Sequence, residues 1–262
     1  MTEPDLPTTV RLFGMDIHAV SAHEALRHVR TWALGPFEKL RYVVTPNVQH
    51  TMVFQENPAF REAYSEAALV VADGWPLVVS SWLLGGSLPE RVAGSDLLPG
   101  LFDATQTGEP VSVFLLGAPP GVGERAASVI GTRWPNVIVK GTYSPPFGFE
   151  RDDAENQRIL ELVAEASPDV LVVGLGAPKQ ELWTYRFRTQ IKAKVALCVG
   201  ASIDFIAGTK ARAPEWMQRS GLEWVHRAVT EPRRLGRRYA EHAIMFPALV
   251  AREWHRTRRG PR

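Results

Sequence analysis

An acid stands between two apolar runs in the stretch LVVADGWPLVV, which covers residues 69–79. Asp73 follows an apolar segment of strand length and precedes one of helix length, so a strand ends and a helix begins beside it. A carboxylate at this position can cap the helix with its side-chain oxygens, or it can act as a general base. The residue type allows both roles, so the rest of the chain must decide between them.

Small, polar and turn-forming residues follow each of six apolar segments of strand length. The segments are residues 41–44, 68–72, 111–116, 137–140, 170–173 and 195–199, and they lead into TPNVQH, DGWP, GAPPGVG, GTYSPPFGF, GLGAPKQE and GASIDFIAG. Amphipathic stretches of helix length lie between them, at residues 21–34, 58–65, 121–134, 153–166 and 178–188. This alternation predicts an α/β fold with a mainly parallel sheet and helices on both faces. Ligands bind such sheets at the carboxyl ends of the strands, so we expect a ligand site at that edge.

Glycines at these strand ends indicate what the ligand is. Gly117, Gly121, Gly174 and Gly176 permit a close approach of the backbone to a ligand. Helix starts near Gly121 and Pro178 would offer unpaired N–H groups to phosphate oxygens. The pattern therefore predicts a nucleotide or another phosphate ester.

One glycine pattern suggests a different enzyme class. The sequence GVGERA at residues 121–126 matches G-x-G-x-x-A after a strand, which is typical of NAD(P)-dependent oxidoreductases. The acid expected about 20 residues further on is missing, because the next predicted strand leads into Lys140 and Gly141. An oxidoreductase therefore stays only an alternative.

The spacing of residues gives little support to metal or thiol chemistry. The chain has no Asp-x-Asp pair, and the intervals between His18, His23 and His28 match no pair of ligands on one helix face. We therefore expect no metal and no other cofactor. The single cysteine, Cys198, lies in the apolar run KVALCVGAS, and we expect it to be a small buried hydrophobe.

The C-terminal segment is basic, whereas the rest of the chain is acidic. Residues 209–262 contain 13 Lys and Arg against 5 Asp and Glu, a net charge of +8; residues 1–208 contain 17 against 23, or −6. The 262 residues, 45% of them hydrophobic, can bury a full core. We therefore predict a body at residues 1–208 and a basic helical appendage at residues 209–262. Such an appendage suits nucleic acid, anionic lipid head groups or a phosphorylated substrate, or it is a solvated helix face.

The chain shows no signal for export and no membrane span. The N-terminus, MTEPDLPTTVRL, is acidic and rich in Pro, unlike a secretory signal, so we expect a cytoplasmic protein. The longest apolar run of the appendage, AIMFPALVA, has nine residues, against the roughly 20 that a spanning helix needs. Aromatic residues interleaved with Arg predict either a segment lying on a membrane surface or helices packed on the body. These residues are Trp216, Trp224, Phe246 and Trp254.

Seven short motifs occur together and in order: TPNVQH, ADG, ERVAGSDLL, LGAPKQE, VGASIDFIAG, RAPEWMQRSGLEWVHR and EPRRLGRRY. With them the chain resembles the WecG/TagA/CpsF glycosyltransferases from about Phe13 to Tyr239. The resemblance implies a Rossmann-like body and a C-terminal appendage that approaches the membrane and helps to close the site. It also implies an enzyme peripheral on the inner face of the cell membrane, acting in cell-envelope or exopolysaccharide synthesis.

The same resemblance implies the reaction. Members of this family transfer a sugar, typically N-acetylmannosamine, from a UDP-sugar to a sugar carried on polyprenyl diphosphate. They are expected to invert the anomeric centre without a metal. The partners expected for this chain are therefore the UDP-sugar, the lipid-linked sugar and an anionic membrane surface, without nucleic acid; a homo-oligomer is left open.

The resemblance assigns a catalytic role to Asp73, which matches the acid of the ADG motif. An inverting transfer needs a general base for the attacking hydroxyl on the face opposite the leaving UDP. Because Gly74 and Pro76 suit a tight turn and an early helix position, the capping role stays the alternative. Thr45 and Asn47 match T-x-N and are expected to bind sugar hydroxyls or to hold the base, with an Asx-type turn as their alternative.

Further residues are assigned to the substrates. Gln180 is expected to contact the donor sugar or the acceptor, whereas Glu181 is expected only to interact favourably with the helix dipole. Tyr143 is expected to stack on the uridine, and Asp204 to hydrogen-bond its ribose. The nucleotide site as a whole is predicted from Gly117, Tyr143, Gly174, Gly176 and Asp204.

Arginines of the appendage are expected to stabilise the charge that develops on UDP. Arg227, Arg234 and Arg237 match basic positions of the family, and the guanidinium fork binds phosphate oxygens in a bidentate way. Attraction to anionic lipids is the alternative role for the same residues.

Two departures from the family pattern widen the choice of donor. Pro76 stands where many members have Gly, and Trp75 beside it is bulky, so both are expected to reshape the donor pocket. UDP-glucose therefore stays open as the donor. From another functional class, a nucleotide-binding or RNA-binding regulator is the alternative, with binding that depends steeply on salt.

Overall fold

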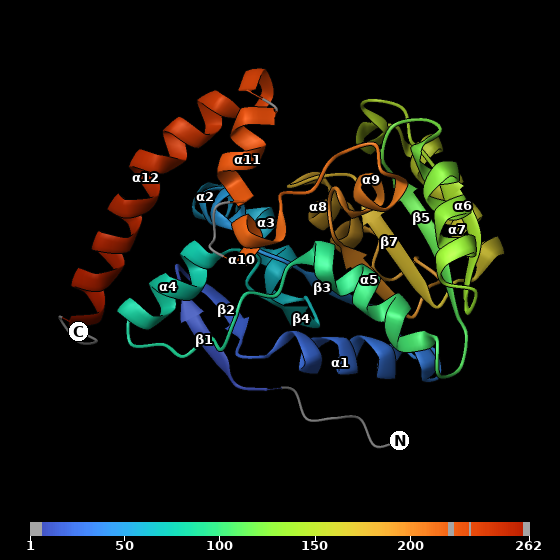
Figure 1. Cartoon of the computed structure of the whole chain (residues 1–262), viewed down its shortest axis with the longest axis horizontal. Helices are drawn as coiled ribbons and strands as arrows, with labels where there is room; N and C mark the ends of the chain where they lie inside the picture. The colour runs from blue at the N-terminus through green and yellow to red at the C-terminus, as the bar shows by residue number, and fades with distance from the viewer. Residues whose placement is uncertain (1–6, 220–222, 231, 259–262) are drawn as a thin grey trace.

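The computed structural model describes residues 7–219, 223–230 and 232–258 (Figure 1). Within these ranges, the side chains at 215, 219, 224, 227, 228, 230, 232–240, 257 and 258 are not described. Six parallel strands form one sheet in the order β4-β3-β8-β7-β5-β6. They are β3 (Arg41–Val44), β4 (Leu69–Val70), β5 (Val111–Gly117), β6 (Val137–Tyr143), β7 (Val170–Gly174) and β8 (Val195–Cys198).

Helices cover both faces of this sheet. Alternate strand residues point to opposite faces, so Tyr42 and Val44 enter one core and Val43 enters the other. The first core includes side chains from α2 (Val48–Glu56), α3 (Pro58–Ser65), α4 (Trp75–Leu83), α7 (Asp153–Ala166) and α8 (Lys179–Arg186). The second includes α1 (Ala22–Leu34), α5 (Gly94–Thr105), α6 (Val122–Arg133) and α9 (Ser202–Ala207). The predicted α/β, Rossmann-like architecture is therefore confirmed.

Local hydrogen bonds explain where predicted helices begin. Ser21 and Glu24 form a capping box at the start of α1: the Ser21 Oγ accepts from the Glu24 N–H at 3.2 Å, and the Glu24 carboxylate accepts from the Ser21 N–H at 2.8 Å. Asp152 caps α7 in a similar way with its side-chain oxygen, after the short 3-10 helix η1 (Phe149–Arg151). These contacts satisfy N–H groups that have no partner inside the helix.

Several boundaries differ from the prediction. β4 contains only Leu69 and Val70, although the apolar run is longer, because β4 is an edge strand that pairs with β3 alone. β6 continues past Lys140 to Tyr143, with a shift of register opposite Phe114. A side chain at Gly141 would lie 2.7 Å from the Phe114 ring, so glycine lets the strand continue there. The antiparallel hairpin of β1 (Thr9–Leu12) and β2 (Met15–His18), and the helices α2, α5 and α9, were not predicted.

The C-terminal segment forms α10 (Glu215–Arg219), α11 (Glu223–Thr230) and α12 (Pro232–Arg258). Phe246 packs edge-on against Phe13 with ring centroids 5.4 Å apart, and Leu249 is buried in the first core. Trp254 is half-buried, whereas Trp216 is 63% exposed; the Trp224 side chain lies outside the described part. Part of α12 thus packs on the body, while the division into residues 1–208 and 209–262 stays a prediction.

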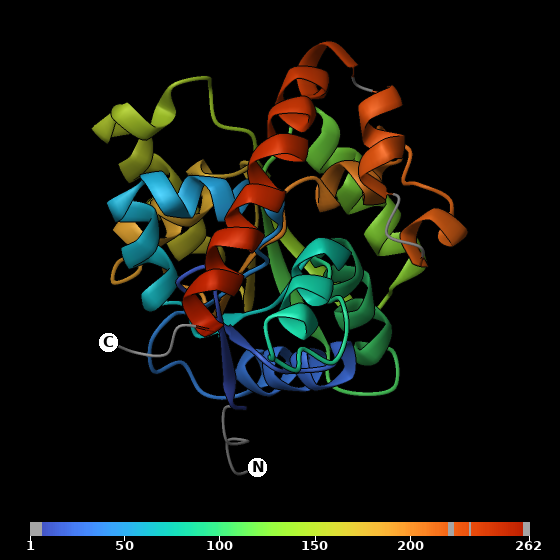
Figure 2. The same ribbon diagram turned by 90° about the vertical axis from the view of Figure 1, so that its left-hand side faces the viewer.

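No helix among the described residues is both long enough and apolar enough to pass through a bilayer. α12 is the longest helix described, with 27 residues, and it includes charged side chains such as Arg252 and Glu253. Figure 2 shows it running along one side of the molecule.

Candidate active site

The chain leaves the neighbouring strands β3 and β8 toward opposite faces of the sheet. After β3 it enters α2, whose Phe54 belongs to the first core, and after β8 it enters α9, whose Ile203 belongs to the second. Such a switch point is where parallel α/β sheets bind ligands. Thr45 lies directly after β3 and is buried; its Oγ1 donates to the Cys198 carbonyl oxygen at 3.4 Å, which joins the two strand ends.

Asp73 lies beside this point, after the edge strand β4. Its backbone N–H donates to the Pro46 carbonyl oxygen at 2.7 Å, so the Asp73 loop is tied to the loop after β3. The N-cap of α4 is Gly74, which has no side chain with which to cap the helix. Asp73 is therefore not the N-cap residue that the capping interpretation made it: Gly74, with a φ of 147°, lies between Asp73 and Trp75, the first residue of α4.

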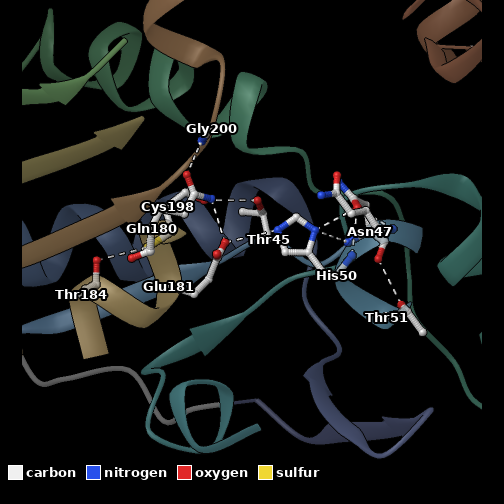
Figure 3. A network of polar contacts seen from close by, with 10 residues as sticks. Thr45, Asn47, His50, Thr51, Gln180, Glu181, Thr184, Cys198 and Gly200 are labelled. Carbon is white, nitrogen blue, oxygen red and sulfur yellow. Dashed lines mark hydrogen bonds and ion pairs between the residues drawn. The ribbon is translucent and has the colours of Figure 1, made fainter. Parts of the chain in front are cut away.

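Asn47 begins a buried chain of polar contacts (Figure 3). Its Oδ1 caps α2 by accepting from the Gln49 N–H at 3.0 Å, and it lies 2.8 Å from His50 Nδ1. The Asn47 backbone nitrogen is further from Nδ1, at 3.4 Å, so we assign the Nδ1 proton to the side-chain contact. His50 Nε2 lies 3.2 Å from Glu181 Oε1, and the two residues form an ion pair when His50 carries both ring protons.

Gln180 and Glu181 continue this chain of contacts to the end of β8. Gln180 Nε2 donates to Glu181 Oε1 at 2.7 Å, and Gln180 Oε1 accepts from the Gly200 N–H at 3.1 Å. Both side chains are buried, and Glu181 has no exposed surface. The contacts thus brace α2, α8 and the loop after β8 against one another, as Figure 3 shows.

Four charged side chains connect the C-terminal segment to the body near Asp73. Arg91 pairs with Glu223 of α11 and with Asp96 of α5, each at 2.9 Å, and Arg212 pairs with Asp96 at 2.7 Å. Burial lowers the pKa of Arg212, but the negative charges of Asp96, Glu223 and Asp73 more than offset it and raise the pKa above its usual value. Arg212 is therefore a permanent cation within electrostatic reach of Asp73.

Two nitrogens of Arg212, Nε and Nη2, are buried and have no hydrogen-bond partner within the described residues. Buried guanidinium nitrogens without acceptors are costly, so a bound anion would satisfy them. The Arg212 side chain is thus suited to a phosphate group.

A hollow of about 700 Å³ lies elsewhere, at the opposite, amino end of β3. Its walls include Leu40, Arg41 and Tyr42, and Arg41 is already paired with Glu38 at 3.1 Å. This hollow could hold a ligand, but the acid, amide and imidazole groups gather at the carboxyl end of the sheet. We therefore assign the active site to the carboxyl end of the sheet.

The sequence profile of the glycosyl transferase WecG/TagA/CpsF family matches residues 10–260. The chain belongs to this family. It is 29% identical over 243 residues to a Staphylococcus aureus (strain MRSA252) protein named N-acetylglucosaminyldiphosphoundecaprenol N-acetyl-beta-D-mannosaminyltransferase, with 93% of each chain covered. Proteins of the same name from strains NCTC 8325 / PS 47 and COL are 28% identical, again with 93% of each chain covered.

Membership of the WecG/TagA/CpsF family confirms the predicted resemblance and the predicted class of enzyme: the chain is a glycosyltransferase. The motifs predicted a resemblance only as far as about Tyr239. The match to the family extends further, to residue 260. The segment with α12 is therefore part of what the family shares.

The structure of this WecG/TagA/CpsF-family enzyme brings together one subset of the predicted site residues. Thr45, Asn47 and Asp73 lie on two loops joined by a hydrogen bond, and Gln180 is linked to Asn47 through Glu181 and His50. Both ends of the Gln180 amide are bonded within the protein, so this side chain also has a bracing role. Its contact with a substrate stays a prediction.

One of the predicted nucleotide residues, Tyr143, lies far along the sheet from Asp73. Tyr143 ends β6, and five strand intervals of about 4.8 Å separate β6 from β4, or about 24 Å in all. Its hydroxyl donates to Glu155, and Arg158 lies over its ring at 5.3 Å. Asp204 is buried in α9 and pairs with Lys210 at 3.1 Å. The roles of Tyr143 and Asp204 toward uridine stay predictions, and the order of the strands separates Tyr143 from Asp73.

The predicted glycines have packing roles of their own. A Cβ at Gly117 would lie 2.6 Å from the carbonyl carbon and oxygen of Gly174, so this glycine lets β5 and β7 end side by side. A Cβ at Gly174 would lie 2.8 Å from Ile203 of α9. Gly176 lies in the turn before α8 with a φ of 77°. A nucleotide role for these positions stays a prediction.

The remaining predictions concern cations, a metal and the thiol. The backbones of Arg227, Arg234 and Arg237 lie in α11 and α12, but their side chains lie outside the described part of the structure. Among the described residues, no three His, Cys, Asp or Glu side chains form a group that could hold a metal ion. Cys198 is buried, as predicted, and burial raises the pKa of its thiol.

Three residues of the site were missed by sequence reasoning. His50, Glu181 and Arg212 all lie within motifs that carry the family resemblance, TPNVQH, LGAPKQE and RAPEWMQRSGLEWVHR, but no role was predicted for His50 or Arg212, and only a dipole role for Glu181. His50 and Glu181, which contact each other, are 131 residues apart in the sequence. Contacts over such separations have no local signal in the sequence.

Proposed function

We propose that this glycosyltransferase moves N-acetylmannosamine from a UDP-sugar to an acceptor sugar on polyprenyl diphosphate, with inversion and without a metal. The observation that carries the proposal is the position of Asp73, which is not the N-cap residue of α4 and whose main chain is held against the Thr45–Asn47 loop. The names of the Staphylococcus aureus relatives support the acceptor, N-acetylglucosaminyldiphosphoundecaprenol, and the transferred sugar.

In the proposed reaction, an acceptor hydroxyl attacks the anomeric carbon of the donor. Asp73 takes the hydroxyl proton, the new C–O bond forms, and the bond to the UDP oxygen breaks with its electron pair on UDP. Thr45 and Asn47 orient the acceptor or hold Asp73. One carboxylate suffices, because UDP leaves as an anion and needs no proton.

Cations stabilise the leaving diphosphate in this proposal. Arg212 has two buried nitrogens without partners among the described residues and lies within electrostatic reach of Asp73. Arg227, Arg234 and Arg237 are proposed to join it from the appendage. Fixed cations of this kind stabilise developing charge in the way that a metal does in other enzymes.

A lipid-linked acceptor implies work at a membrane surface. We propose that the enzyme is peripheral on the inner face of the cell membrane, with the net charge of +8 in residues 209–262 attracted to anionic lipids. Cell-envelope or exopolysaccharide synthesis would be its setting.

The test incubates the full chain with a panel of UDP-sugars and a lipid-linked N-acetylglucosamine acceptor, with and without EDTA. We expect turnover with UDP-N-acetylmannosamine in both conditions, and a fall in kcat of about 10²–10⁴-fold in Asp73→Asn. Asp16→Asn is the matched control, because Asp16 is exposed and pairs only with Arg11 among the described residues; it should keep wild-type kcat.

Each outcome bears on a separate part of the proposal. Loss of turnover with EDTA would contradict the metal-free reaction, and an active Asp73→Asn would exclude Asp73 as the base. UDP-glucose is the second candidate donor, favoured by Trp75 and Pro76 next to Asp73. Turnover with UDP-glucose alone would replace the donor, and no turnover with any sugar would reject the function.

A further inference from the structure

The helix that follows Asp73 has one exposed face without any charge. α4 begins at Trp75, two residues after Asp73, and its sequence WPLVVSSWL contains no charged residue. Leu77, Val78, Ser80 and Ser81 are buried. On the outer side, Val79 is 41%, Trp82 50% and Leu83 64% exposed. The spacing of Trp75, Val79, Trp82 and Leu83 places them on one side of the helix, which we call the α4 face.

The two tryptophans of the α4 face are held in place. The Trp75 and Trp82 rings meet edge-on with centroids 6.2 Å apart, and Trp82 Nε1 donates to the Leu88 carbonyl oxygen at 2.9 Å. Trp82 therefore exposes apolar ring surface while its one polar group is bonded. Ring surface of this kind is favoured at the boundary between water and lipid.

The position of the α4 face relative to Asp73 indicates what covers it. Val79 and Leu83 lie about 6 and 12 Å along the helix axis from Trp75. If the acceptor sugar lies at Asp73, as proposed above, the diphosphate and the lipid attached to it must extend out of the site close to α4. The α4 face is an uncharged surface within about 12 Å of Trp75 along the helix axis, and so lies close enough to contact the lipid.

α12 lies on the same side of the molecule as α4. Figures 1 and 2 place α4 and α12 side by side, and both face the viewer in Figure 2. Ile244 and Met245 of α12 are exposed as well. A second copy of the chain is a poorer occupant, because the four side chains of the α4 face are few against the roughly 20–30 residues that each partner contributes to a standard protein interface.

We propose that the α4 face inserts into the acyl region of a lipid bilayer and receives the polyprenyl chain of the acceptor there. This inference rests on the proposed function. It assigns the hydrophobic part of membrane binding to the helix next to the general base, rather than to the basic appendage alone. Insertion of α4 would thereby hold Asp73 at the level of the bilayer surface where the acceptor sugar lies.

The test uses the full chain and vesicles of phosphatidylcholine, which carry no net charge and so exclude attraction by the basic appendage. The variants are Leu83→Glu and Val79→Ser, and the matched control is Ile138→Glu, because Ile138 is 51% exposed on β6 at the other edge of the sheet. Co-sedimentation should show binding reduced about tenfold or more in Leu83→Glu and by a smaller factor in Val79→Ser. Ile138→Glu should bind as the wild type does.

A second readout separates this inference from the proposed function. With a water-soluble acceptor that carries a short lipid chain, both variants should keep wild-type turnover; with the acceptor embedded in neutral vesicles, turnover should fall with binding. Unchanged vesicle binding in both variants, or an equal loss in Ile138→Glu, would overturn the inference. So would a change in oligomeric state caused by Leu83→Glu, seen by analytical ultracentrifugation, because it would assign the face to a second copy. Failure of the wild type with both acceptors would reject the proposed function without altering the vesicle result.

Discussion

Glu181 has two carboxylate oxygens in different surroundings. Oε1 lies near His50 and accepts from Gln180, whereas Oε2 is buried and has no hydrogen-bond partner within the described residues. The Tyr64 hydroxyl is also buried without a partner there; burial raises the pKa of Tyr64, and the negative charge of Glu181 adds to this effect. A buried carboxyl group needs hydrogen-bond partners, and the partners of Glu181 are His50 and Gln180, which makes it a positioning residue for Asn47 and Gln180.

Replacement of Glu181 by Gln tests this role. The amide keeps the shape but weakens the contact with His50 and brings N–H groups toward Gln180, so we expect the free energy of unfolding to fall by about 1–3 kcal/mol. We also expect a lower kcat with KM less affected, because the loop with Thr45 and Asn47 would be held less firmly. Urea unfolding and initial rates measure the two effects. Glu165→Gln, on the exposed side of α7, is the control and should change neither.

At the scale of elements, Asp169 joins the amino ends of three strands. It lies just before β7, accepts from Ser112 of β5 through N–H at 2.8 Å and Oγ at 2.6 Å, and pairs at 2.8 Å with Lys194, which precedes β8. Lys194 also donates to the Ala33 carbonyl oxygen at the end of α1. The active site lies at the carboxyl ends of the strands, and the position of these ends depends on the strand register that the Asp169 contacts help to set at the amino ends.

The pKa of Asp169 gives this contact a pH dependence. Burial opposes its ionisation, but the bonds from Lys194 and Ser112 more than offset burial and lower the pKa below its usual 3.8. Because the folded-state pKa is lower than the unfolded one, the ionised carboxylate stabilises the fold above about pH 4, and this contribution disappears as the pH falls through the folded-state pKa.

We therefore expect Asp169→Asn to lower the free energy of unfolding by about 1–3 kcal/mol at pH 7. The difference from wild type should stay constant down to about pH 5 and shrink below about pH 4. Urea unfolding at several pH values measures it. A difference that grows on acidification would contradict the sign, and Asp16→Asn, in the exposed Arg11 pair, should show little effect at any pH.

At the scale of the whole molecule, the C-terminal segment has both packing and chemical roles. Leu249 and Phe246 of α12 pack against the first core, and Glu223 of α11 pairs with Arg91 of the body. Removal of residues 209–262 would therefore expose apolar surface as well as remove the arginines proposed for the diphosphate. We expect a chain ending at Gly208 to fold with a lowered Tm and to lose nearly all turnover.

Leu249→Ala in the full chain separates these two effects. It leaves a cavity that should cost about 2–5 kcal/mol of the free energy of unfolding, while every arginine remains. We expect this variant to have a lowered Tm but to keep turnover at a temperature below its unfolding transition. Full turnover by the truncated chain would show that the appendage has no catalytic part.

The sequence by itself predicted the elements whose signals are local. The strands β3, β5, β7 and β8 are largely apolar because both faces of the sheet are buried, and α1 and α7 carry their caps beside them. The motifs predicted the family. The short edge strand β4 and the extension of β6 through Gly141 depend on which strand lies next to them, so the sequence misplaced both boundaries.

Asp73 shows where the tertiary structure alone decided. The sequence determined that an acid stands between a strand and a helix, and left capping and catalysis open. The structure makes Gly74, not Asp73, the N-cap residue, and the Asp73 N–H donates to the Pro46 carbonyl oxygen. His50, Glu181 and Arg212 joined the site through contacts with residues far away in the chain. Such contacts form only when the sheet brings distant strand ends together, because their energy depends on burial and distance in space rather than on sequence spacing.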